Sequence, residues 1–100
     1  MDMNWKIEDQ HVVIHCGPRL DKETIQDQRD FLIEILAKKK PIIFQANQIA
    51  KIDTSSLQLL LSFTLAASKQ NIEWEWQEPS AALINQAKLL GMNDLLKLPG

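Results

Sequence analysis

Most of the side-chain chemistry of this sequence lies in four consecutive residues, Asp53, Thr54, Ser55 and Ser56, within the stretch "AKIDTSSLQLLLSF". A carboxylate and three hydroxyls directly before an apolar run are typical of a helix N-terminus, where side-chain oxygens accept unpaired backbone N–H groups. Only one of Asp53, Thr54 and Ser55 is needed for that cap. The others are available for a second role, and a phosphate on one of them would meet the favourable end of the helix dipole.

The helix expected from Ser55 to about Lys69 has two faces when its residues are placed at about 100° each. The face expected to pack on a sheet carries Leu57, Leu60, Leu61, Thr64, Leu65 and Ser68. The opposite face carries Ser55, Gln58, Leu59, Ser62, Ala66 and Lys69, with Phe63 at its flank. Two explanations stay open for Leu59 and Phe63: a neighbouring helix covers them, or they form a small exposed apolar patch of the kind that marks protein contacts. A phosphate on the adjacent hydroxyls would repel a partner docked on such a patch.

The remaining elements predict an α/β fold. Residues 4–8 and 11–16 alternate or are β-branched and indicate a β-hairpin. A helical period follows from Asp21 to Lys39, then a buried strand over 42–46, an alternating strand over 71–77, and a helix capped by Ser80 and stopped at Gly91. The order is ββαβαβα. It predicts one domain over residues 1–100, with a mixed sheet, right-handed crossovers and helices that cover mainly one face.

Composition excludes several classes of partner. The 100 residues carry a net charge of −2, with 45% hydrophobic and 24% charged residues, so no nucleic acid or anionic membrane is expected. The apolar run from Leu57 to Ala67 is shorter than the roughly 20 residues of a membrane span. The N-terminal stretch is acidic and does not resemble a secretory signal. We therefore expect a cytoplasmic protein without direct membrane insertion.

Enzymatic arrangements are weak in this sequence. His11 and His15 share one side of a strand but have no further metal ligand at a suitable spacing, so neither a metal nor a cofactor is expected. A triad of Ser55, His15 and Asp53 lacks the Gly-x-Ser-x-Gly elbow. Cys16 is expected to be a small core residue. We predict no catalytic residues and no enzyme activity.

The stretch "IDTSSLQLL" resembles the signature of STAS domains, usually Asp-Ser-Ser-Gly-Leu followed by apolar residues, found in bacterial anti-sigma factor antagonists. The resemblance extends over nearly the whole chain, because the element order above is also that of the family. "WEWQEPSAAL" and "AKLLGMNDLL" resemble small stand-alone STAS proteins of bacterial signalling and chemotaxis clusters. The chain departs from the family at Ser56, which occupies the usual glycine position and could crowd the approach of a partner.

This resemblance implies a protein-binding regulatory module rather than an enzyme. The family's phosphorylated hydroxyl corresponds to Ser55, with Thr54 as the second candidate, and the implied partner is an anti-sigma factor, a serine kinase or another signalling protein. The expected contact surface comprises Asp53, Thr54, Ser55, Ser56, Gln58, Leu59 and Ser62. An alternative implied by a second likeness is a constitutive accessory subunit of a bacterial lipid-transport ABC ATPase. Homodimerisation through the hairpin strands stays open.

Overall fold

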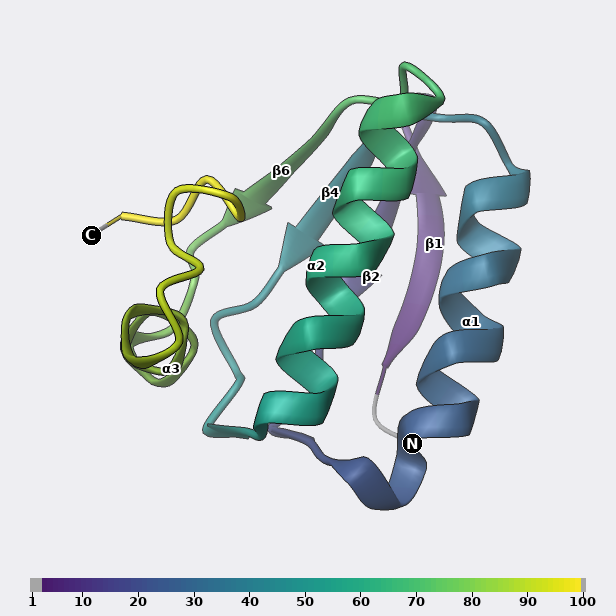
Figure 1. The fold of residues 1–100 in the computed structure, drawn as a ribbon. Helices are drawn as coiled ribbons and strands as arrows, with labels where there is room; N and C mark the ends of the chain where they lie inside the picture. Colours follow the sequence, from purple (N-terminus) through teal and green to yellow (C-terminus); the bar gives the residue numbers. More distant parts are fainter. Residues whose placement is uncertain (1–2, 100) are drawn as a thin grey trace.

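The computed structural model describes residues 3–99 and contains a mixed β-sheet with three α-helices (Figure 1). The helices are α1 (Ile25–Ala37), α2 (Thr54–Lys69) and α3 (Ala81–Leu89), and a short 3-10 helix, η1 (Lys22–Thr24), precedes α1. The strands are β1 (Asn4–Glu8), β2 (His11–His15), β3 (Arg19–Leu20), β4 (Ile42–Gln45), β5 (Lys51–Ile52) and β6 (Trp74–Gln77). The predicted α/β class is confirmed, and the predicted ββαβαβα order holds for all elements except the two-residue strands β3 and β5, which were not predicted.

The main sheet has the strand order β1-β2-β4-β6. Strands β1 and β2 pair antiparallel as the predicted hairpin, whereas β4 pairs in parallel with both β2 and β6. Asp9 and Gln10 join the hairpin with φ of 48° and 67°, the left-handed pair that a tight two-residue turn requires. Strands β3 and β5 form a separate parallel pair of two residues each, which is too short to show a period in the sequence.

One face of the sheet forms the core with α1 and α2; in Figure 1, α2 lies in front of the sheet and α1 lies beside it, next to β1. The register places Ile14, Phe44 and Trp76 side by side on this face, and the rings of Phe44 and Trp76 stack with centroids 4.4 Å apart. The opposite face presents Lys6 and Glu75, both exposed. The expectation that helices cover mainly one face is thus confirmed for α1 and α2, while α3 lies beyond β6 (Figure 1).

The helix boundaries follow local chemistry. Asp21 caps η1 by accepting the backbone N–H of Glu23 at 3.1 Å, so the predicted helix from Asp21 begins as a 3-10 turn. The Oγ of Ser80 accepts the N–H of Leu83 at 3.1 Å and caps α3 as predicted. Gly91 follows α3 with a φ of 68°, the left-handed conformation that ends many helices.

Candidate functional site

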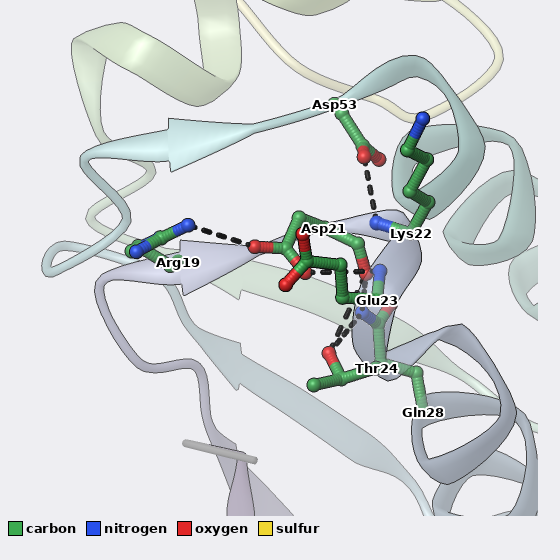
Figure 2. Close-up of polar contacts among 7 residues, drawn as sticks. All are labelled: Arg19, Asp21, Lys22, Glu23, Thr24, Gln28 and Asp53. Carbon is green, nitrogen blue, oxygen red and sulfur yellow. Dashed lines mark hydrogen bonds and ion pairs between the residues drawn. The ribbon is translucent and has the colours of Figure 1, made fainter.

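The carboxylate of Asp53 caps α2. Its Oδ1 accepts the backbone N–H of Ser56 at 2.9 Å, in the geometry expected of a residue just before the first helical turn. Its Oδ2 accepts the backbone N–H of Lys22 at 2.7 Å, at the start of η1 (Figure 2). A single side chain therefore satisfies unpaired donors of two helical segments. Of the three cap candidates in the sequence, Asp53 is the one that performs this role.

Two opposing effects act on the pKa of Asp53. Partial burial raises it, but the backbone N–H groups of Ser56 and Lys22, the nearby Ser56 hydroxyl and the Lys22 ammonium stabilise the charged form. The pKa therefore lies below its ordinary value. Asp53 is consequently a carboxylate at neutral pH and a poor general base. Its geometry is that of a structural anchor beside the hydroxyls.

A second set of hydrogen bonds holds the entry to α1. Asp21 accepts the N–H of Glu23 and an Arg19 guanidinium N–H, both at 3.1 Å (Figure 2). The side-chain amide of Gln28, a buried residue, donates to the carbonyl oxygen of Asp21 at 2.9 Å and to the hydroxyl of Thr24 at 3.1 Å. These bonds fix the start of α1 beside the start of α2, because Asp53 joins the two segments at Lys22.

The three hydroxyl residues after Asp53 have different environments. Thr54 and Ser55 are exposed, so both phosphorylation candidates are accessible to a modifying enzyme. Ser56 is fully buried, and its Oγ has no hydrogen-bond partner within residues 3–99. Its side chain does not lie on the surface where the sequence suggested a partner contact. The side chain at the family's glycine position points into the protein instead of crowding the surface.

The buried face of α2 differs from the predicted one. Its buried side chains are Ser56, Leu57, Leu60, Phe63, Thr64 and Ala67, whereas Leu65 is 48% exposed. The placement of Leu65 on the packing face and of Phe63 at the exposed flank was therefore wrong. The ring of Phe63 packs edge-on against Phe44 of the sheet, with centroids 5.8 Å apart. This contact places Phe63 in the core.

A groove between α1 and α2 brings the remaining predicted residues together. It has a volume of about 330 Å³ and is lined by Lys22, Ile25, Arg29, Ser55, Gln58, Leu59 and Ser62. Leu59 is partly buried there, while Ser55, Gln58 and Ser62 are exposed. Both explanations for Leu59 hold in part, because the neighbouring helix covers some of it and the groove leaves the rest accessible.

Sequence reasoning missed the α1 side of this groove. Lys22, Ile25 and Arg29 recur at spacings of three and four residues, which places them on one face of a helical segment. That spacing was the available signal. The spacing indicates one wall of a groove only when α2 is known to lie beside α1, which the sequence alone does not show.

Other candidate chemistry is not supported by the described residues. Cys16 is buried, and burial raises the pKa of its thiol to about 12, far above that of a reactive thiolate. Within residues 3–99, no group of three or more His, Cys, Asp and Glu side chains is arranged to hold a metal ion. In the same range, no helix combines the length and the apolar character required to cross a bilayer.

Comparisons with solved structures show the same fold at low identity. An anti-sigma factor antagonist from Mycobacterium paratuberculosis has a TM-score of 0.83 at 13% identity, covering 96% of this chain and 82% of that one. A putative anti-sigma factor antagonist from Thermotoga maritima has a TM-score of 0.80 at 17% identity, covering 96% and 84%. The antagonist SpoIIAA in its unphosphorylated form has a TM-score of 0.75 at 15% identity, covering 93% and 84%. The phosphorylated form of SpoIIAA, described as a Bacillus cell fate determinant, gives 0.72 at 16% identity, covering 93% and 86%.

A search of curated proteins found no match. A family model described as the STAS domain matches residues 2–99, nearly the whole chain. This coverage confirms the resemblance drawn from the Asp53 motif and the element order: the chain belongs to the STAS domain family.

Proposed function

We propose that this chain is a non-enzymatic regulatory module of the anti-sigma factor antagonist type, which docks a signalling protein in the bacterial cytoplasm. The partner would be an anti-sigma factor, a serine kinase or a related signalling protein. The docking surface would comprise Thr54 and Ser55 with the groove residues Gln58, Leu59 and Ser62. The observation that carries this proposal is the convergence of accessible hydroxyls and a partly exposed leucine in one groove.

The same site suggests how docking would be controlled. Ser55 is exposed and lies two positions after Asp53, whose carboxylate is charged at neutral pH. A phosphate on Ser55 would add about −2 of charge beside that carboxylate and at the edge of the groove. A partner in contact with Leu59 would then have to approach a strongly anionic rim. Thr54, also exposed, is the second candidate for this modification.

Affinity capture from the native lysate tests the docking surface. We expect wild-type bait to recover a signalling protein that Leu59→Asp bait fails to recover, because the substitution places a charge in the groove. Leu65→Asp is the matched control, since Leu65 lies on the same helix, is 48% exposed and does not line the groove. Circular dichroism of both variants checks that each is folded. Equal recovery by wild-type and Leu59→Asp bait would reject this surface.

A further inference from the structure

The groove between α1 and α2 is lined by positive charge, although the protein as a whole is acidic. Its lining contains two cationic side chains, Lys22 and Arg29, and no acidic one. The chain as a whole carries a net charge of −2. The groove is therefore a local basic site on an acidic protein, and its charge favours the approach of anions.

Neither groove cation is used in an ion pair within the described part of the chain. The ion pairs among residues 3–99 are Lys6–Glu8, Arg19–Asp21 and Lys38–Glu34. Arg29 makes only a long contact of 3.5 Å to the amide oxygen of Gln26. Both residues are exposed, so an incoming carboxylate can reach them without breaking a direct ion pair among residues 3–99.

The Asp53 carboxylate interacts electrostatically with the Lys22 ammonium, but hydrogen bonds already engage both of its oxygens. Its two oxygens accept backbone N–H groups, those of Ser56 and Lys22, at 2.9 and 2.7 Å. Figure 2 shows the Lys22 side chain running alongside Asp53, and the Lys22 ammonium contributes to the lowered pKa of this carboxylate. The Lys22 ammonium nevertheless makes no direct ion pair within residues 3–99 and is exposed, so it can also bind an external anion.

The apolar part of the groove lies between the two helices. Ile25 and Leu59 are both partly buried, one from each helix, and each leaves surface for contact. A segment that pairs a carboxylate with a neighbouring apolar side chain would satisfy both parts of the groove. A basic segment would be repelled by Lys22 and Arg29.

From this charge complementarity we propose that the groove receives an acidic, amphipathic segment of the partner protein. One or more of its carboxylates would bind Lys22 and Arg29, while an apolar side chain would pack on Leu59 and Ile25. This inference rests on the proposed function and names the chemistry of the partner. It also gives phosphorylation a direct mechanism, because a phosphate on Ser55 lines the same groove and would occupy the cations that the partner's carboxylate needs.

The test uses the full chain and two synthetic helical peptides of 20 residues with leucines at i, i+3, i+4 and i+7. One peptide carries Glu at its polar positions, and the other carries Gln at the same positions. Titrations followed by backbone amide NMR measure both the affinity and the site. We expect the Glu peptide to bind at least tenfold more tightly, with the largest shifts at residues 22–29 and 55–62. Raising the salt concentration should weaken the Glu peptide selectively.

The double variant Lys22→Gln/Arg29→Gln should lose at least tenfold in affinity for the Glu peptide. Lys88→Gln, which removes an exposed cation on α3, should bind as wild type. Equal binding of the two peptides, no binding of the Glu peptide at millimolar concentration, or shifts centred outside the groove would overturn the inference. A lysate partner that depends on Leu59 but is retained by the double variant would overturn it while leaving the proposed function intact.

Discussion

The Oδ2 atom of Asp53 lies 2.7 Å from the backbone nitrogen of Lys22, 31 residues earlier in the chain. Because the other carboxylate oxygen caps α2 at Ser56, one side chain ties the start of the α1 segment to the start of α2. The two walls of the groove are thereby held in a fixed relation. The motif aspartate is a structural determinant of the docking surface, whatever contact it also makes with a partner.

Replacing Asp53 with alanine should lower the free energy of unfolding by about 2–3 kcal/mol, because it removes a helix cap and a second charge-assisted hydrogen bond. Ser80→Ala is the matched control, since Ser80 caps α3 with a single bond, and it should cost about 1 kcal/mol. Urea denaturation of the three proteins measures the difference. Equal losses in the two variants would show that the bond to Lys22 adds nothing.

The same bonds predict a pH dependence of stability. The pKa of Asp53 in the folded state lies below its ordinary value of 3.8, so the charged form stabilises the fold. This contribution is complete above the unfolded-state pKa and is lost as the pH falls through the folded-state pKa. The stability gap between wild type and Asp53→Asn should therefore be constant from about pH 5 to 7 and narrow below about pH 4. A gap that stays constant down to pH 2 would contradict the role of the charge.

Ser56 offers a test of the buried hydroxyl. Its Oγ is fully buried without a partner among residues 3–99, and an unsatisfied buried hydroxyl is destabilising. Ser56→Ala should raise the free energy of unfolding by about 1 kcal/mol, helped by the higher helix propensity of alanine. Ser56→Gly should fall about 1 kcal/mol or more below Ser56→Ala. Ser62→Ala, at an exposed position of the same helix, should change stability by less than about 0.5 kcal/mol. A loss of stability in Ser56→Ala would instead show that the Ser56 hydroxyl stabilises the Asp53 carboxylate, whose lowered pKa it helps to set.

The sequence was sufficient for the order of the elements because strong local signals bound them. The alternation of Trp74 and Trp76 with glutamates defined β6, and Ser80 and Gly91 marked the ends of α3. The two-residue strands β3 and β5 lacked any such signal. They form only because Arg19–Leu20 and Lys51–Ile52 are brought together in the fold.

The candidate site was predicted on one wall only. The period of α2 placed Ser55, Gln58, Leu59 and Ser62 on an accessible face, as the structure shows. The same helical period wrongly placed Phe63 at the exposed flank, because a helical projection does not show that Phe63 packs against Phe44 of the sheet. The cations of the opposite wall belong to a segment more than twenty residues away, and pairing such segments requires tertiary information.

Phosphorylation can be tested directly on protein purified from its native cell. Intact-mass measurement across growth conditions should detect a fraction carrying one phosphate, and fragmentation should place it on Ser55 rather than Thr54, although both are exposed. Ser55→Ala protein should lack this species. The absence of any phosphorylated form under every growth condition would remove the switch from the proposal and leave the docking surface.

A charge at Ser55 distinguishes a switch from a constitutive subunit of a transporter ATPase. Ser55→Asp places a negative charge at the groove's rim and should weaken binding of a captured partner at least tenfold if the module is a switch, whereas Ser55→Ala should bind as wild type. A constitutive subunit would rely on apolar contact with Leu59, which is partly buried in the groove. Its binding should then tolerate Ser55→Asp and be lost in Leu59→Asp. Calorimetric titration of the four proteins measures this contrast, and a partner bound equally by wild type and Ser55→Asp would exclude the phosphorylation switch.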